Sequence, residues 1–353
     1  MIKNITGNID FVESLRGKSA TFILAMSNTA TANIPGITQA GIPGMLHLTP
    51  TLDAEFLTTG EVRSLDNVAQ TPKGVPTPAL ITRAVHLLQP FKDIELLNLG
   101  LEVTPQIEYF TRYDFDINPS NSIESGANID AMEVFQKGVE FGQDYICKSD
   151  YIILGESVPS GTTTALATAL ALGYDCEDKF SSSFKNTPKN IKKVVISKAL
   201  ENIKDKIELF DKIGSVADNM LIFNAGFILG ANNKDFKILL AGGTQMACVL
   251  LIINSILNQM DGEIDSSKIA LCTTKWVFED ENSDIKGLLE MVDFPINSYY
   301  SSFDFTLSNH PALKLYDEGE AKEGVGAGGA LMYGILNGLN KQQITSKVEE
   351  FLG

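Results

Sequence analysis

The chain has 353 residues, of which 44% are apolar and 20% charged, a composition typical of a globular protein with a large buried core. Its formal charge of −16 argues against a nucleic-acid partner, because a nucleic-acid groove needs clustered Lys and Arg to replace counterions. Four scattered cysteines without a C-x-x-C pair indicate neither a disulfide framework nor a structural zinc site.

Five short apolar runs alternate with longer helical patterns along the chain. The runs have the length and the bounding turn residues of strands buried on both faces of a sheet, and they lie at 21–25, 94–99, 151–154, 236–240 and 268–272. The helical patterns lie at 78–88, 129–147, 162–172, 191–211, 244–259 and 285–292. This alternation predicts an α/β fold of three layers, a mainly parallel sheet with helices on both faces.

The two ends of the chain differ from this α/β core, which we expect to span residues 20–307. A Gly-rich apolar helix is expected at 324–336, and a final amphipathic helix follows it. We therefore expect residues 1–19 and 308–353 to form a small, mostly helical subdomain that packs on the core.

Three further segments bear on the location of the protein and on its surface. The most apolar helical pattern, 246–257, is interrupted by Asn254 and is too short to cross a bilayer. The first residues lack the apolar stretch of a signal peptide, so we expect a cytoplasmic protein without a membrane partner. The polar segment 181–190 is expected to be a surface connection.

Ligands of parallel α/β sheets bind beyond the carboxyl ends of the strands, so the loops after the runs are the places to search. The loop after the first run holds Ser27 and Asn28. The loop after the fourth run holds Gly242 and Gly243, which permit either close approach of a ligand to the backbone or close helix packing.

The loop after the third run, residues 155–164, has the features of a phosphate-binding site. A helix that starts after a glycine-containing loop presents unpaired amides and partial positive charge to an anion. Gly161 permits close approach, and the hydroxyl groups that follow can donate hydrogen bonds from Thr162, Thr163 and Thr164. Capping of a buried helix, with Ser160 as the first candidate, is the competing interpretation.

Two details restrict the chemistry of this loop. Five residues separate Gly155 from Gly161, and Thr162 stands where a Walker A loop has lysine, so kinase or ATPase chemistry loses its main support. Glu156 would repel a phosphate unless it faces hydroxyl groups such as those of a ribose. The sequence does not indicate which lysine neutralises the phosphate; Lys237 and Lys275 lie near expected strand ends.

A second candidate site precedes the Gly-rich helix. Gly324, Gly326 and Gly329 satisfy G-x-G-x-x-G, but no strand precedes them and no acidic residue ends a following strand, so a dinucleotide fingerprint is excluded. Glu323 stands directly before a helix start that is nearly free of side chains, where a carboxylate is stabilised by the helix dipole and a flat ring can approach. An acidic first residue on a tightly packed helix is the competing interpretation.

Three motifs occur together in one known family. They are Gly-Glu-x-x-Pro-x-Gly-Thr-Thr-Thr at 155–164, Gly-Gly-x-Gln-x-Ala at 242–247 and Lys-Glu-Gly-Val-Gly-Ala-Gly-Gly at 322–329. From about residue 22 to residue 336 the chain resembles the nicotinate-nucleotide–dimethylbenzimidazole phosphoribosyltransferases of cobalamin biosynthesis, and most of all their divergent archaeal branch.

The resemblance implies transfer of the phosphoribosyl group of nicotinate mononucleotide to 5,6-dimethylbenzimidazole, without a cofactor or metal, in a homodimer. Glu323 would be the general base. The ribose phosphate would be held by the 155–164 loop, namely Gly155, Glu156, Ser160, Gly161, Thr162, Thr163 and Thr164, together with Gly242 and Gly243. The acceptor base would lie near Ser27, Asn28, Gly324 and Gly326.

The chain departs from the bacterial members of that family in two places. It has Ser-Val-Pro-Ser at 157–160 where they carry Met-Gly-Ile-Gly, and Ala-Met-Ser-Asn at 25–28 where they carry Ala-Asp-His-Gly. The second region borders the acceptor pocket in the family, so the acceptor stays open, with adenine or another benzimidazole as alternatives. The other hypotheses are a transferase with a different acceptor and a non-enzymatic nucleotide-binding protein in which Glu323 only caps a helix.

Overall fold

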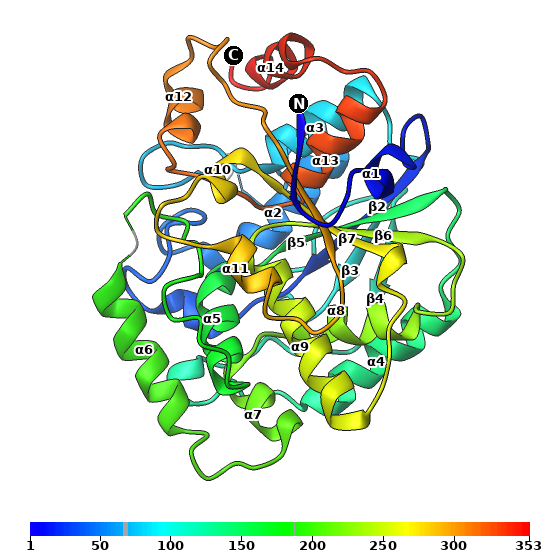
Figure 1. The fold of residues 1–353 in the computed structure, drawn as a ribbon. Coiled ribbons are helices and arrows are strands. Elements are labelled where there is room, and N and C mark those ends of the chain that lie inside the picture. Colours follow the sequence, from blue (N-terminus) through cyan, green and yellow to red (C-terminus); the bar gives the residue numbers. More distant parts are fainter. Residues whose placement is uncertain (66–69, 187) are drawn as a thin grey trace.

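The structure, a computed structural model, describes residues 1–65, 70–186 and 188–353. These residues form one eight-stranded sheet in the order β1-β8-β7-β6-β5-β2-β3-β4, shown in Figure 1. Neighbouring strands are parallel except for the pair of β1 and β8, which is antiparallel. The strands are β1 (Ile2–Thr6), β2 (Ala20–Met26), β3 (Asp93–Asn98), β4 (Thr111–Asp114), β5 (Tyr151–Ser157), β6 (Lys237–Ala241), β7 (Ile269–Thr274) and β8 (Asn297–Ser301).

The central strands are buried on both faces and divide the core into two halves. Ile23 and Ala25 of β2 belong to one apolar cluster, whereas Phe22 and Leu24 belong to the other, because successive side chains point to opposite faces. The first half packs against α4 (Ala131–Asp144), α5 (Gly161–Ala171), α6 (Lys189–Glu201), α7 (Leu209–Val216), α8 (Asn219–Gly230), α9 (Thr244–Met260) and α11 (Ile285–Leu289).

Helices from both ends of the chain cover the opposite face of the sheet. In Figure 1, α3, α13 and α14 lie together on that side, with both termini nearby. The helices of this side are α1 (Asp10–Glu13), α2 (Thr49–Thr59), α3 (Ala79–Leu88), α12 (Pro311–Asp317), α13 (Ala327–Leu336) and α14 (Lys341–Glu349), and the short α10 (Lys275–Phe278) follows β7. In the described part of the chain, no helix combines the length and the apolar character needed to cross a membrane.

The expected three-layer α/β fold is confirmed, and each of the five apolar runs forms a strand. The single helix expected at 191–211 is wrong, because the chain leaves α6 after Glu201 and starts α7 at Leu209. α8 was not predicted, since it is apolar on all sides and so lacks the periodicity of a half-buried helix. β8 was not predicted either, because its sequence Asn-Ser-Tyr-Tyr-Ser is polar although its last four residues are buried.

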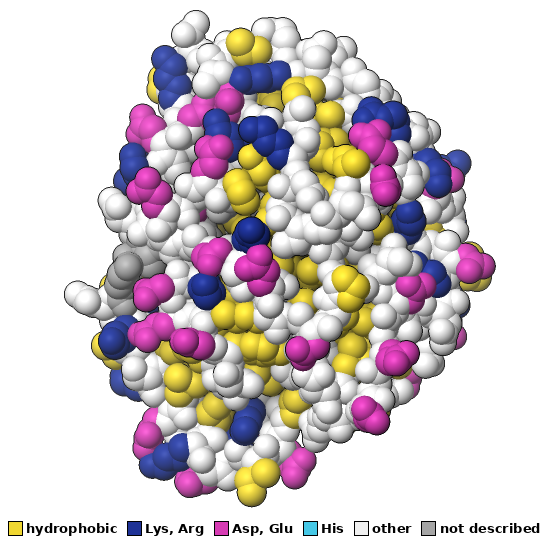
Figure 2. All heavy atoms as spheres, viewed as in Figure 1, with side chains coloured by type: hydrophobic (Ala, Val, Ile, Leu, Met, Phe, Trp, Pro, Cys, Tyr) yellow, Lys and Arg dark blue, Asp and Glu magenta, His cyan; other side chains and the backbone are white. Residues whose placement is uncertain are grey.

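The N-terminal segment 1–19 contributes β1 to the edge of the sheet beside β8. The division of the chain into a core and a small helical subdomain stays a prediction. Acidic and basic side chains are interspersed over the face shown in Figure 2, without a continuous basic stripe on that face.

Candidate active site

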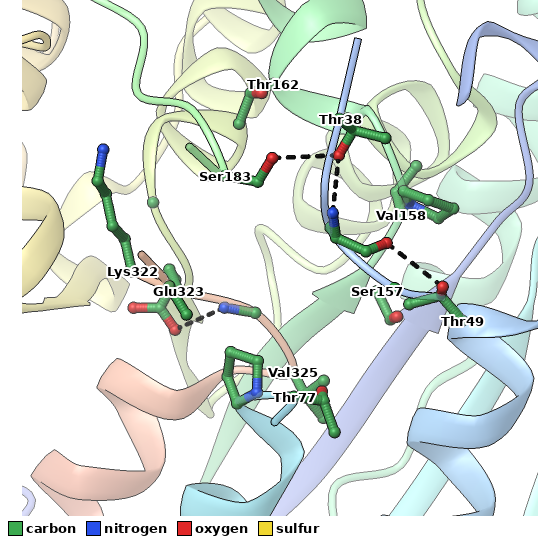
Figure 3. A pocket seen from close by; sticks show the side chains of 18 of the residues that line it. Thr38, Thr49, Thr77, Ser157, Val158, Thr162, Ser183, Lys322, Glu323 and Val325 are labelled. Carbon is green, nitrogen blue, oxygen red and sulfur yellow. Dashed lines mark hydrogen bonds between the residues drawn. The ribbon is translucent and has the colours of Figure 1, made fainter. Parts of the chain in front are cut away.

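A cavity lies beyond the carboxyl end of β5, where several segments from different parts of the sequence meet. It encloses about 950 Å³, part of which is open to solvent. Its walls come from the loop between β5 and α5, the start of α9, the segment before α13, and residues around α2 and before α3. Figure 3 shows this arrangement, with Thr162 on one side and with Glu323 and Thr77 toward the other.

Glu323 lies in this cavity and is held by four hydrogen bonds. The amides of Gly328 and Thr274 each donate to its carboxylate at 3.0 Å, and Gly324 N and Thr273 Oγ1 donate at 3.3 Å. Burial nevertheless raises the pKa of Glu323 to about 7, although these donors lower it. A carboxylate that titrates near neutrality can accept a proton from a weakly acidic N–H group.

The glycines around Glu323 are required by close contacts. A Cβ at Gly328 would lie 2.4 Å from the carbonyl carbon of Thr273 and 2.8 Å from Glu323 Oε2, so a larger residue would displace the carboxylate. Gly326 has φ of 65° and a Cβ there would lie 2.9 Å from Phe22. Gly324 lines the cavity, whereas Gly326 packs against Phe22 and Gly155 outside it.

Glu156 is a second carboxyl group in the cavity and is almost fully buried. Gln245 Nε2 lies 3.0 Å from its Oε2. Burial, followed by the charges of Glu323, Asp218 and Asp53, raises the pKa of Glu156 to about 8. At pH 7 the side chain is therefore mainly neutral and can donate a hydrogen bond to a hydroxyl group.

Gly161 makes the contact between Gln245 and Glu156 feasible. A Cβ at Gly161 would lie 2.3 Å from Gln245 Nε2 and 2.8 Å from its amide carbon. Gly243 also lines the cavity, whereas Gly242 lies against Met246 and outside the lining.

The hydroxyl groups at the start of α5 point in different directions. Ser160 has φ of 68°, lines the cavity, and its buried Oγ has no hydrogen-bond partner among the described residues. Thr162 lines the cavity and receives a hydrogen bond from Lys192 Nζ at 3.1 Å. Thr163 and Thr164 lie outside the lining; Thr164 Oγ1 instead donates to Asp218 Oδ2 at 2.5 Å.

Two buried lysines lie beside this end of the cavity, and neither was identified from the sequence. Lys192 is 5% exposed, and burial, together with the charge of Lys322, lowers its pKa to about 7. Lys322 lines the cavity and donates to Asp280 Oδ2 at 2.7 Å and to Phe184 O at 3.0 Å. Lys192 could have been found, because it shares a helix face with the buried residues Val195, Ile196 and Ala199.

The two lysines considered from the sequence lie elsewhere. Lys237 begins β6, at the end of the strand opposite to the cavity, and donates to Ser14 Oγ at 2.5 Å. Lys275 pairs with Asp304 at 3.3 Å and does not belong to the lining.

The expected acceptor-side residues Ser27 and Asn28 also lie outside the cavity lining. The side chain of Asn28 connects two loops, since Nδ2 donates to His47 O at 3.0 Å and Oδ1 accepts from Glu102 N at 2.9 Å. Ser27 Oγ is buried without a partner in the described part of the chain. Near this region, the residues that do line the cavity are Asp53, Thr77 and Ser157.

The interpretation of 181–190 as a surface connection is wrong at its beginning. Ser181 and Ser182 are buried and, with Ser183, line the cavity. Ser181 Oγ donates to Asp280 at 2.7 Å, so the segment is folded inward by hydrogen bonds that composition does not reveal. Residue 187 of this segment lies outside the described residues.

The described residues contain no cluster of three or more His, Cys, Asp or Glu side chains arranged to bind a metal ion. They do contain a cavity with the start of α5 at one end, where Lys192 contacts Thr162, and with carboxyl groups at the other. Such a cavity suits a ligand that has a phosphate, hydroxyl groups and a flat ring.

Comparison with solved structures confirms the expected fold. The chain is similar to the nicotinate-nucleotide–dimethylbenzimidazole phosphoribosyltransferase of Thermus thermophilus, with a TM-score of 0.60 and 12% identity over 95% of this chain and 83% of that one. A structure of CobT from the same organism gives a TM-score of 0.58 and 12% identity over 94% and 84% of the two chains. At this identity the likeness shows the fold alone.

Sequence comparison adds relatives along nearly the whole chain, although no family model matches it. A UPF0284 protein of Sulfurisphaera tokodaii is 38% identical over 99% of this chain and 96% of its own length. UPF0284 proteins of Saccharolobus solfataricus and Saccharolobus islandicus are 36% and 35% identical, over 94% and 100% of this chain and over 92% and 97% of their own lengths. The chain therefore belongs to the UPF0284 family, whose members here are archaeal.

Proposed function

We propose that this protein transfers the phosphoribosyl group of nicotinate mononucleotide to a ring nitrogen of 5,6-dimethylbenzimidazole or a related base. The products would be nicotinate and α-ribazole 5′-phosphate or its analogue. One observation carries the proposal: a single cavity joins Thr162 at the start of α5, whose hydroxyl Lys192 contacts from outside the cavity lining, to the carboxylate of Glu323. The fold shared with a Thermus phosphoribosyltransferase supports the same reaction.

The phosphate of the nucleotide would bind at the start of α5. The partial positive charge of the helix start attracts an anion, and Thr162 and Ser160 add hydroxyl donors. Lys192 would supply the positive charge, because a bound phosphate favours the protonated form of an amine whose pKa burial has lowered to about 7. Neutral Glu156 would donate to a ribose hydroxyl, which removes the repulsion expected from an ionised side chain.

The reaction is a displacement at the anomeric carbon. The acceptor nitrogen forms a bond to C1′ while the bond from C1′ to the nicotinate nitrogen breaks, and its electron pair neutralises the cationic ring. Glu323 takes the proton of the acceptor N–H group, because its pKa of about 7 makes it a base near neutral pH. Fixing phosphate and ribose beforehand lowers the entropic part of the barrier.

The test is incubation of the purified protein with nicotinate mononucleotide and benzimidazole-type bases, followed by detection of nicotinate and the α-riboside phosphate. Glu323→Gln is expected to lower kcat by about 10²- to 10⁴-fold, the usual contribution of a general base. Glu279→Gln, at a carboxylate that is 53% exposed and outside the cavity lining, is the matched control and should keep full activity.

Two results would reject the proposal. Full activity of Glu323→Gln removes the base assignment. Nucleotide binding without product formation from any acceptor favours the non-enzymatic alternative, in which Glu323 only caps a helix. The homodimer implied by the resemblance stays a prediction, which sedimentation would test.

A further inference from the structure

The cavity is also lined by Asp53, a carboxylate that has no part in the reaction described above. Asp53, on α2, lines the cavity and is 3% exposed. Its Oδ1 accepts a hydrogen bond from the Thr77 hydroxyl and its Oδ2 one from the Ser157 hydroxyl, both at 2.7 Å. An ionised carboxylate has about four acceptor positions, so roughly two are left for a ligand.

Asp53 is costly to the fold in its present surroundings. Burial raises its pKa to about 6, whereas the two hydroxyl groups lower it, and no Lys, Arg or His of the described residues forms an ion pair with it. A buried carboxylate without a counter-charge destabilises a protein, and an aliphatic side chain would pack in the same place at lower cost. Carboxylates kept in this way are frequent at ligand sites.

Asp53 lies at the end of the cavity that holds the proposed base. Its partner Thr77 directly precedes Pro78, and a Cβ at Gly324 would lie 3.5 Å from Pro78 Cγ, so this wall lies against the residue after Glu323. Figure 3 shows Glu323 and Thr77 away from Thr162, where the phosphate is proposed to bind. The neighbouring wall is apolar and suits a flat ring; it includes Val75, Pro76, Pro78 and Val325.

We propose that Asp53 selects the acceptor by accepting a hydrogen bond from a second donor group on its ring. The preferred acceptor is then a bicyclic aromatic nitrogen base that carries an amino or hydroxyl group on the edge away from the attacking nitrogen. This inference rests on the proposed function and narrows its acceptor. The ring N–H group is directed to Glu323 and the second donor to Asp53.

5,6-Dimethylbenzimidazole fits this wall poorly. It has a single N–H donor, which Glu323 uses, and its methyl groups would displace water from Asp53 without replacing the lost hydrogen bonds. A site built around a buried polar group discriminates strongly against ligands that leave it unpaired.

Three acceptors of nearly equal size test the inference: 5-aminobenzimidazole, 5-hydroxybenzimidazole and 5-methylbenzimidazole. With saturating nicotinate mononucleotide at pH 8, the wild type should use the amino and hydroxyl compounds with kcat/KM at least about tenfold above that of the methyl compound. Asp53→Leu, which has the same branching at Cγ but is larger and apolar, should abolish or reverse this preference. Asp53→Asn keeps an acceptor oxygen without the charge and should give an intermediate preference.

Glu55→Gln is the matched control on the same helix. Glu55 is buried, lies outside the cavity lining and accepts hydrogen bonds from the backbone of Arg63, Ser64 and Gln106. This variant should keep the preference of the wild type even if its melting temperature falls. Melting curves of all variants separate loss of folding from loss of selectivity.

Equal kcat/KM for the three acceptors in the wild type would overturn the role of Asp53 while leaving the proposed reaction intact. If the Asp53 variants lost activity equally with all three acceptors and had a raised KM for the nucleotide, Asp53 would be assigned to the ribose. That result would also overturn its role in acceptor selection. If no acceptor releases nicotinate, the proposed function itself fails. Calorimetry of the three compounds with the wild type and Asp53→Asn then decides the inference. It is supported if the wild type binds 5-aminobenzimidazole more tightly than 5-methylbenzimidazole and Asp53→Asn weakens this preference. It is overturned if the wild type binds the three compounds equally.

Discussion

The ammonium of Lys192 lies 3.1 Å from the hydroxyl of Thr162, the first threonine of α5. The two residues come from different helices and are 30 positions apart, and their contact places a buried lysine beside the N-terminus of α5. Lys192→Met is expected to raise KM for nicotinate mononucleotide by about 10- to 100-fold, the value of a charge-assisted hydrogen bond to phosphate. Nicotinate riboside, which has no phosphate, should be used equally by both proteins.

Steady-state kinetics with the nucleotide and the nucleoside measures this difference. The adjacent Lys193 supplies the control, because its side chain is 74% exposed and pairs with Glu177 on the surface. Lys193→Met should behave like the wild type. An equal loss on nucleotide and nucleoside in Lys192→Met would contradict a contact with phosphate.

The pH dependence of kcat/KM is expected to be bell-shaped. Glu323 must be deprotonated to act as a base, so activity rises with pH up to its pKa of about 7. Glu156 must be protonated to donate to the ribose, so activity falls above its pKa of about 8. The charges of Glu156 and Glu323 influence each other's titration, so the two apparent pKa values of the profile belong to the pair rather than to either residue.

Glu156→Gln separates the two limbs. Glutamine keeps an N–H donor at all pH values, so the fall above pH 8 should disappear while the rise below pH 7 stays. Initial rates between pH 6 and 9 test both points. A falling limb that survives in Glu156→Gln would assign it to another group, such as Lys192.

Glu156 should make the free energy of unfolding depend on pH in the opposite sense to a carboxylate in an ion pair. Its pKa is raised on folding, so the folded state binds the extra proton and the stability is complete below the unfolded value near 4.5. That stability is lost as pH rises toward 8, by at most about 1.4 kcal/mol per pH unit. The melting temperature of the wild type minus that of Glu156→Gln should therefore decrease between pH 5 and 8. The melting temperature of the wild type minus that of Glu279→Gln, a variant at an exposed carboxylate, should stay constant over the same pH range.

The buried ion pair of Lys322 and Asp280, at 2.7 Å with both side chains at most 5% exposed, offers a test of the cavity wall. Asp280→Asn should lower the free energy of unfolding by about 3–5 kcal/mol, because it leaves a buried ammonium without its counter-charge. The double variant Lys322→Met/Asp280→Asn should recover part of the loss. Urea unfolding of the wild type, Asp280→Asn, Lys322→Met and the double variant gives the coupling energy, and purely additive losses would contradict a direct interaction.

Much of the architecture follows from local sequence patterns. Apolar runs such as 151–154 must be buried on both faces, and the helical stretches between them require crossover connections, which together specify a parallel sheet. Glu323 and the 155–164 loop were identified because a strand end or a helix start marks the place of each in the chain. β8 and α8 lack such marks, since a polar strand and a wholly apolar helix have no diagnostic periodicity.

The sequence by itself determined the fold class, the loop that begins α5 and the carboxylate before α13, because these depend on neighbours within a few residues. Only the tertiary structure decided that Lys192 contacts Thr162, that Asp53 lines the cavity, and that Ser27 and Asn28 lie outside it. The raised pKa values of Glu156 and Glu323 also belong to the folded state. They arise from burial and from charges distant in sequence, and these interactions exist only after the sheet has brought the loops together.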